Sequence, residues 1–216
     1  MKKSVLLAIA LLCLSVPSFA QTQSGPRTGG YIAGIGGMTF GTESDAVFGG
    51  EAGVETSRNI TIYGTMGRMQ NVAPKYVNNG LDVLNADLTA STGEVWNFKA
   101  KAPTLFGIGG VKYRVPTNSS VRPYVLGGAG FGSINIKVTE PHFGNVTDAL
   151  IAEGTFTQSD FKATKFLVEM GGGLEIPVGP MYVDTGYRFG KFVGVEDANV
   201  SRAYAGIGYR FGAATK

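Results

Sequence analysis

The chain has 216 residues, a formal net charge of +3 and 44% hydrophobic residues. This small charge excludes the strong positive field that nucleic-acid binding requires, so we expect no nucleic-acid partner. The single cysteine, Cys13, lies close to the start of the chain, and a protein that lost this segment would have no disulfide, no cysteine metal site and no cysteine nucleophile.

Residues 1–20 have the pattern of a cleaved secretory signal peptide. Lys2 and Lys3 form a basic start, residues 5–16 are an apolar run, and Ser18 and Ala20 are small residues placed for cleavage before Gln21. The pattern predicts export from the cytoplasm. It leaves residues 21–216 as one domain.

Eight segments show the period-two alternation that predicts β-strands. The best helical pattern, residues 83–90, is predicted to lie within a loop. The predicted strands are residues 31–40, 46–56, 60–71, 104–115, 121–138, 165–177, 181–193 and 199–211.

The alternation predicts an apolar exterior around a charged interior. In residues 199–211, Ala203, Ile207 and Phe211 share one face, and Arg202 and Arg210 share the other. An interior of mixed charge is typical of a membrane barrel, so we predict an all-β, eight-stranded antiparallel up-and-down transmembrane β-barrel. The alternative is a soluble sandwich with a wet polar face. The predicted interior charge network consists of Glu51, Glu55, Arg114, Glu169, Glu175, Asp184, Arg188, Arg202 and Arg210.

The predicted connections alternate between short and long. Residues 57–59, 116–120 and 178–180 are rich in turn-forming residue types, whereas long loops are predicted near residues 72–103 and 139–164. Shorter loops are expected near residues 41–45 and 194–198. This alternation matches the periplasmic turns and extracellular loops of outer-membrane barrels.

Two segments, RPYVLGGAG at 122–130 and YAGIGYRF at 204–211, resemble the OmpA/OmpX-like family of eight-stranded outer-membrane barrels. The resemblance covers essentially the whole mature chain and implies a monomer in the outer membrane of a Gram-negative cell. The implied partners are outer-membrane lipid and the barrel-assembly machinery, which would read Tyr209 and Phe211 as an assembly signal. The chain departs from the family pattern because GAATK follows Phe211.

No residue pattern predicts catalysis, a metal site or a cofactor. His142 is the only histidine, and Gly144 stands where barrel deacylases carry a serine two positions after their histidine. The acidic residues of the long loops lack calcium-loop spacing. Trp96, Phe98 and Phe143 are expected to pack the loops together or to continue the strands, and the alternative is that they anchor a surface ligand.

The predicted role is non-enzymatic. We expect a plugged barrel that supports the envelope or makes surface contacts through its long loops. Three alternatives stay open, namely a narrow conduit for ions or small apolar solutes, an outer-membrane enzyme acting on lipid, and a soluble periplasmic ligand-binding barrel. A fully paired interior network would count against the conduit, because eight strands leave an interior that side chains can just fill.

Overall fold

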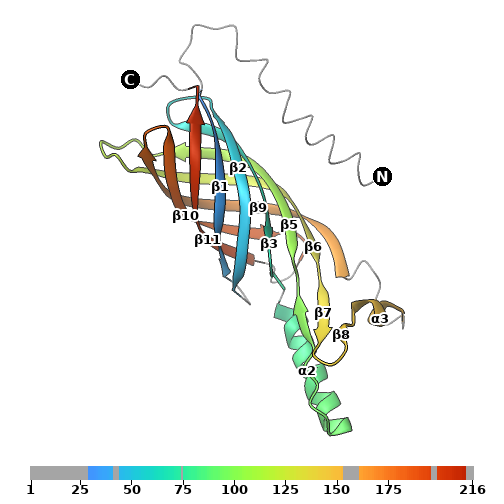
Figure 1. Cartoon of the computed structure of the whole chain (residues 1–216). Helices are drawn as coiled ribbons and strands as arrows, with labels where there is room; N and C mark the ends of the chain where they lie inside the picture. Colours follow the sequence, from blue (N-terminus) through green and yellow to red (C-terminus); the bar gives the residue numbers. More distant parts are fainter. Residues whose placement is uncertain (1–28, 41–43, 74, 153–160, 196–198, 213–216) are drawn as a thin grey trace.

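Eight antiparallel strands close into a barrel, as the sequence predicts (Figure 1). The computed structural model describes residues 29–40, 44–73, 75–152, 161–195 and 199–212, so the predicted signal peptide lies outside the described residues. Around the wall, the strand order is β1-β11-β10-β9-β6-β5-β3-β2. The barrel strands are β1 (Gly30–Phe40), β2 (Asp45–Glu55), β3 (Ile60–Met69), β5 (Thr104–Arg114), β6 (Arg122–Asn135), β9 (Lys162–Val178), β10 (Met181–Phe192) and β11 (Asn199–Phe211).

The connections sort into two ends of the barrel. Residues 56–59, 115–121 and 179–180 join β2 to β3, β5 to β6 and β9 to β10, and we call this side the turn end. The opposite side, which carries the two long connections 70–103 and 136–161 together with residues 41–44 and 193–198, is the loop end. Every strand pairs with both neighbours in an uninterrupted register, for example Tyr31 opposite Gly53 on β2 and opposite Arg210 on β11.

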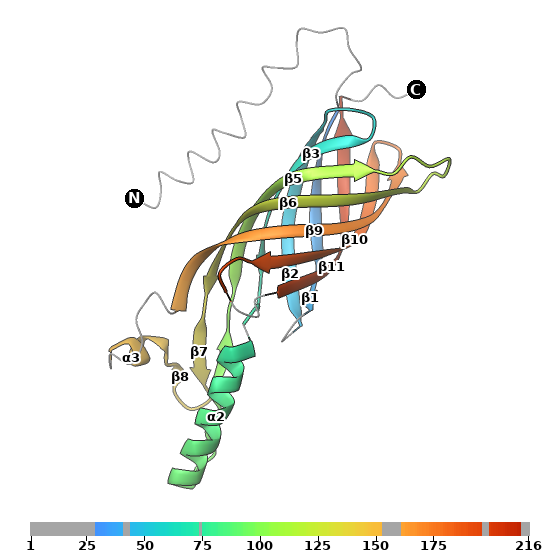
Figure 2. The same ribbon diagram turned by 180° about the vertical axis from the view of Figure 1, so that it is seen from behind.

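The described parts of the two long connections contain helices and short strands, a feature that the sequence prediction left open. They contain α2 (Lys75–Thr92), β4 (Lys99–Lys101), β7 (Lys137–Glu140), β8 (Gly144–Asn145) and α3 (Thr147–Ala152). The predicted helical patch is therefore only the second half of α2. These elements project beyond the loop end, and we call them the extension (Figure 2).

The extension continues the barrel wall. Thr104 pairs with Ile134 inside the barrel, and Lys101 pairs with Lys137 beyond it, in the same register. β4 and β5 therefore lie on one strand path, and β6 and β7 lie on the next. The inner face of this ribbon stays apolar, since Ala100 and Val138 are both buried.

No helix in the described part of the chain is long and apolar enough to cross a membrane.

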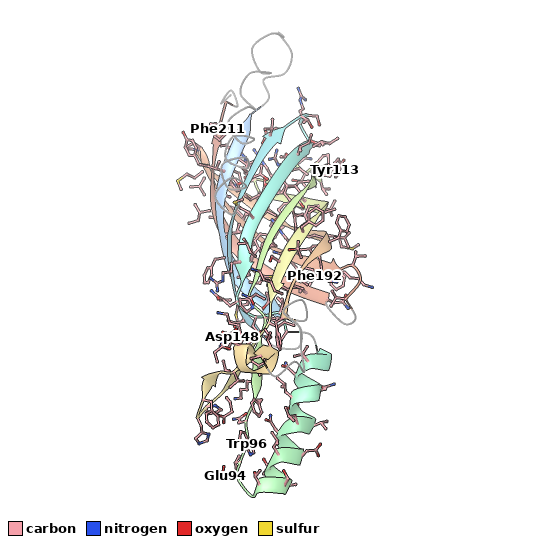
Figure 3. The ribbon with its side chains drawn as sticks, turned by 90° about the vertical axis from the view of Figure 1, so that its right-hand side faces the viewer. Glu94, Trp96, Tyr113, Asp148, Phe192 and Phe211 are labelled. Carbon is pink, nitrogen blue, oxygen red and sulfur yellow. The ribbon has the colours of Figure 1, made fainter. Side chains whose placement is uncertain are left out.

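The barrel is apolar outside and largely polar inside. Outward side chains such as Leu105, Met170 and Ile207 are 59–66% exposed, whereas the inward ones are buried. Figure 3 shows Tyr113 and Phe211 toward the turn end and Trp96 at the far tip of the extension. An exposed apolar wall of this extent marks a surface that contacts lipid.

Each inward tyrosine of the barrel stands directly opposite a glycine on a neighbouring strand. A Cβ added to Gly53 would lie 2.5 Å from the ring of Tyr31, so the ring occupies the space that a side chain would take. Rings that cover strand glycines are a known way of stabilising curved sheets. Tyrosine rings in this way account for five of the 33 glycines in the chain. The five pairs are Tyr31–Gly53, Tyr63–Gly110, Tyr124–Gly173, Tyr182–Gly208 and Tyr204–Gly186.

Candidate functional site

Five acidic and five basic side chains form a network of ion pairs in the described interior of the barrel. Nine of them are the residues predicted from the sequence. Seven of those nine are buried, and Glu55 and Arg210, nearer the turn end, are partly exposed.

Glu51 on β2 is the central acceptor of this network. Its two carboxylate oxygens contact Lys112 Nζ at 2.8 Å and Arg188 Nη2 at 2.6 Å. The Tyr31 hydroxyl donates a third hydrogen bond at 2.6 Å. Lys112 comes from β5 and Arg188 from β10, so these contacts tie together strands that are not neighbours in the wall.

Lys112 is a buried cation that the predicted network lacks. Its ammonium lies 2.8 Å from Glu51, 3.5 Å from Glu175 and 3.7 Å from Asp184, and its side chain is fully buried. The signal is present in the sequence, because Lys112 has the same strand parity as Arg114. However, Phe106 shares that face, so β5 reads as having a mixed face rather than a charged one.

A second acidic centre lies nearer the turn end. Glu175 on β9 accepts from Arg114 Nε at 3.1 Å and also from Arg210. Arg114 reaches Glu55 at 2.8 Å, and Arg210 lies 3.8 Å from the same carboxylate. With the exception of the Arg188–Glu169 pair, every interior ion pair joins strands that are not neighbours. The network therefore crosses the interior instead of lining the wall.

Arg202 on β11 lies nearer the loop end. It contacts Glu169, and its guanidinium carbon lies 4.5 Å from the centroid of the Phe106 ring. Arg188 is placed in a similar way, 4.4 Å from the ring centroid of Tyr204. Aromatic faces attract cations most strongly where water is excluded, so these rings help to hold the arginines in place.

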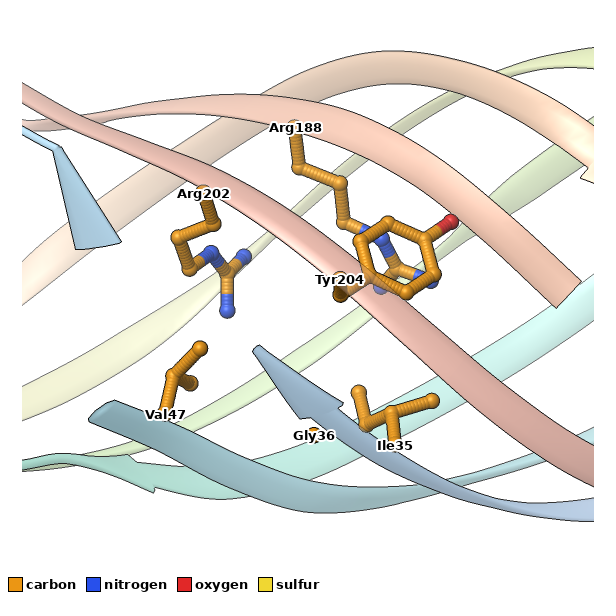
Figure 4. A pocket seen from close by; sticks show the side chains of 6 residues that line it. All are labelled: Ile35, Gly36, Val47, Arg188, Arg202 and Tyr204. Carbon is orange, nitrogen blue, oxygen red and sulfur yellow. The ribbon is translucent and has the colours of Figure 1, made fainter. Parts of the chain in front are cut away.

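The space left between these side chains is very small. Figure 4 shows a cavity bordered by Arg188, Arg202 and Tyr204 on one side and by Ile35 and Val47 on the other. Its volume is about 10 Å³. This is close to the least that one water molecule needs.

A buried apolar cluster fills the loop end of the interior, on the side of the charge network that faces the extension. Phe106, Leu167 and Phe192 pack inside the barrel, and the cluster runs on without a break to Ala100 and Val138 in the extension. The interior is therefore charged toward the turn end and mainly apolar toward the loop end.

The extension is held by specific contacts of its own. The Asn85 side chain on α2 accepts from the Phe98 backbone N–H at 2.7 Å and donates to the Phe98 carbonyl at 3.1 Å. Trp96 stacks on Phe98 and on Phe143 with centroid separations of 5.7 Å and 6.3 Å. These aromatic side chains therefore join two connections of the barrel, as the packing interpretation predicts, although Phe143 remains 69% exposed.

His142, the residue before Phe143 of this aromatic stack, is oriented by the carboxylate of Glu140. Its Nδ1 lies 3.0 Å from Glu140 Oε1, and Glu140 Oε2 accepts the backbone N–H groups of His142 and Phe143 at 2.6 Å and 3.0 Å. The hydrogen bond to Glu140 and its negative charge raise the pKa of His142, and the same contacts lower the pKa of Glu140.

A nucleophile beside this pair would be needed for triad chemistry. The hydroxyl of Thr147, five residues after His142 in the sequence, donates to and accepts from the backbone of Val138 instead. Gly144 has a φ of 74° at the turn that follows the histidine. Ser159, a hydroxyl-bearing residue later in the same connection, lies outside the described residues.

The remaining predictions concern the ends of the strands and metal sites. Tyr209 and Phe211 point outward from β11 at the turn end and are 48% and 50% exposed. Within the described ranges, no group of three or more histidine, cysteine or acidic residues is arranged to hold a metal ion.

A closed eight-stranded barrel with an apolar exterior and a charged interior defines the class of integral membrane β-barrels. The comparisons identify the family within this class. The family model for the outer membrane protein beta-barrel domain matches residues 6–211, and the chain belongs to this family.

Solved structures show the same fold at low sequence identity. A major outer membrane protein from Thermus thermophilus aligns with a TM-score of 0.57 and 10% identity, covering 84% of this chain and 99% of that one. The Neisserial surface protein A aligns with a TM-score of 0.51 and 13% identity over 85% and 97% of the two chains. The attachment invasion locus protein Ail of Yersinia pestis gives 0.50 and 16% identity over 87% and 100%. No match is found among curated proteins.

Proposed function

We propose that this chain is a closed, non-enzymatic outer-membrane barrel whose body anchors the extension at the cell surface. In this proposal the signal peptide directs export, the barrel-assembly machinery reads the outward aromatic residues Tyr209 and Phe211, and the protein works as a monomer. The loop end faces the exterior and the turn end faces the periplasm, as is usual for such barrels.

The observation that carries the proposal is the set of ion pairs across the interior. Glu51 is joined to Arg188 and Lys112 from strands two or three places away around the wall. Opening a path would separate buried opposite charges, and an unpaired buried charge is costly. A closed body of this kind supports a structural or surface-contact role over transport.

The extension supports surface contact as the purpose of the anchor. It presents apolar side chains to solvent at Val83, Val95 and Phe143, which are 63%, 79% and 69% exposed. Exposed apolar side chains on an ordered projection are common at contact sites between proteins.

The test is ion conductance of residues 21–216 refolded and inserted into a planar bilayer. The plug predicts no resolved single-channel steps for the native protein. Arg188→Ala, which removes a cross-barrel partner of Glu51, should permit ion flux, whereas Lys191→Ala on the outward face of the same strand should stay silent. Reproducible conductance of the native protein that changes in Arg188→Ala would replace the anchor by a conduit.

The enzyme alternative has a separate test. His142→Ala should leave the acyl-chain composition of envelope lipid unchanged in cells that express the protein. A change in lipid composition that tracks His142 would overturn the non-enzymatic assignment.

A further inference from the structure

A group of four exposed lysines lies on the outward face of the wall where the barrel passes into the extension. Lys101 on β4 stands directly opposite Lys137 on β7, and Lys99 lies two residues before Lys101 on the same face. Lys162, at the start of β9, pairs with Asn135 on the same outward face. We call these four residues the lysine patch.

The lysine patch follows directly from the apolar wall. Phe131 and Phe166 are outward, paired residues in edge-to-face contact at 5.5 Å. The next outward pair is Ser133 with Thr164, and the lysines follow. Lys162 is four residues beyond Phe166, which is about 13 Å along the strand at roughly 3.3 Å per residue.

This order along the strands matches the layers of a bilayer leaflet. An aromatic pair marks the edge of the hydrocarbon region, and the polar headgroups lie just outside it. Lysine side chains at this level can extend along the wall and keep their ammonium groups among the headgroups.

The charges of the lysine patch are not neutralised within the described part of the chain, where none of the four lysines makes an ion pair. Lys101 and Lys137 are a directly opposed pair of like charges, an arrangement that destabilises a sheet. An anion lying between the two ammonium groups would remove that repulsion.

We propose that the lysine patch is a binding site for the phosphate groups of lipids in the outer leaflet. The occupant is a lipid-borne phosphate rather than a soluble anion because the patch continues the lipid-facing wall. The site fixes the height and rotation of the barrel in the membrane. It does not depend on whether the barrel conducts.

The experiment uses the full mature chain folded in zwitterionic micelles. Phosphatidic acid is titrated into the micelles, and the backbone amide shifts of Asn135 and Thr139, which lie on the same face as the lysines, report binding. A basic residue near an anionic surface contributes about 1 kcal/mol, which is about fivefold in affinity. Lys101→Gln/Lys137→Gln should therefore weaken binding about 30-fold.

Two variants separate charge from position. Lys101→Arg/Lys137→Arg keeps both charges and should bind within about twofold of the native chain. Arg58→Gln/Lys191→Gln removes two exposed charges elsewhere, one in the β2–β3 turn and one on the outward face of β10, and should also bind normally. Because it relieves like-charge repulsion, the double glutamine variant should melt no lower than the native chain in phosphate-free micelles.

Three results would overturn the proposal. The first is unchanged binding in the double glutamine variant, and the second is an equal loss in Arg58→Gln/Lys191→Gln. The third is binding of inorganic phosphate, in micelles without phosphatidic acid, at the same concentration as the lipid, which would make the patch a site for soluble anions.

Discussion

Substitution of Gly53 by alanine tests whether the interior is as tightly packed as the tyrosine–glycine pairs indicate. The new Cβ would lie 2.5 Å and 2.8 Å from two carbons of the Tyr31 ring, and 2.9 Å from the carbonyl oxygen of Ile62. Real Cβ atoms do not approach other atoms this closely, so the ring or the wall must shift.

The Tyr31 ring has little freedom to move away. It is 1% exposed, meets Tyr182 edge-on at 5.9 Å, and has the Lys112 ammonium 5.2 Å from its centroid. Its hydroxyl donates to Glu51 at 2.6 Å. Displacement of the ring therefore disturbs the central acceptor of the charge network as well as the packing.

The expected cost follows from these two effects. Overpacking a well-filled interior costs about 1–3 kcal/mol. A hydrogen bond to a charged group contributes about 1.5–3 kcal/mol, part of which is lost. Because the neighbours relax, we expect Gly53→Ala to lower the free energy of unfolding by about 2–4 kcal/mol.

The assay is urea unfolding in lipid vesicles, followed by the difference in gel mobility between folded and unfolded barrel. Gly64→Ala is the matched control, because Gly64 lies on the adjacent strand β3 and an added Cβ meets nothing within 4 Å. That substitution should be neutral or stabilise by up to about 1 kcal/mol. Tyr31→Ala combined with Gly53→Ala should cost less than the sum of the two single changes.

An unfolding midpoint for Gly53→Ala that equals those of the native chain and of Gly64→Ala would refute the reasoning. It would mean that the ring shifts freely and that the interior around Glu51 is looser than the contacts indicate.

Three further predictions concern the charge network, the histidine and the extension. Lys112→Met leaves three buried carboxylates without their shared cation and should lower the free energy of unfolding in urea by about 3–5 kcal/mol. In an NMR titration, His142 should titrate above 6.5, and Glu140→Gln should bring its pKa back toward 6.5. The raised pKa of His142 stabilises the folded state below pH 6.5, and this contribution is lost as the pH rises through the folded pKa of His142. The lowered pKa of Glu140 stabilises the folded state above pH 4.5, and this contribution is lost as the pH falls through the folded pKa of Glu140. Amide protection of residues 142–143 should therefore be highest between about pH 4.5 and 6.5, and a maximum elsewhere would count against the pair. Asn85→Ala removes two hydrogen bonds to the segment before β4 and should speed proteolysis of the extension, whereas the exposed Asn79→Ala should not.

The barrel is predictable from the sequence because its physical requirement repeats along every strand. Lipid outside and buried charge inside force an alternation with period two, and the turn-forming residues mark where each strand reverses. The observed bounds of β10, Met181–Phe192, differ from the predicted 181–193 by one residue at one end. The structure confirms the predicted fold class, an eight-stranded antiparallel barrel.

The extension is harder to predict because its stability comes from packing. α2 contains Asn78, Asn79 and Gly80, which are weak helix formers, and it has no acidic residue in its first turn and no basic residue in its last. Its partly buried Val77 and Leu81 instead pack against the apolar cluster. Such contacts between segments far apart in sequence leave only a short local pattern, which is why the sequence indicates a helix over 83–90 alone.

The sequence does not predict Lys112 as a member of the charge network, and the reason is again structural. The interior changes character along the barrel axis, so the inward residues of β5 run from Phe106 and Ile108 at the loop end to Lys112 and Arg114 toward the turn end. A single strand therefore shows a mixed inner face. Its charged part is recognisable only once the register places Lys112 level with Glu51 and Asp184 of other strands.

The continuous register also links the interior, the extension and the lysine patch. One pair of strand paths carries Lys112 inside the barrel, Phe106 in the apolar cluster, and Lys101 opposite Lys137 on the outside. Because successive residues point to opposite faces, a one-residue insertion between β4 and β5 would turn Lys101 inward and Ala100 outward. A two-residue insertion would preserve the faces but shift all three β4–β7 pairs, so that Lys101 no longer stands opposite Lys137. The first change should therefore disrupt the fold of the extension, and the second should leave it folded while weakening the interaction with lipid phosphate.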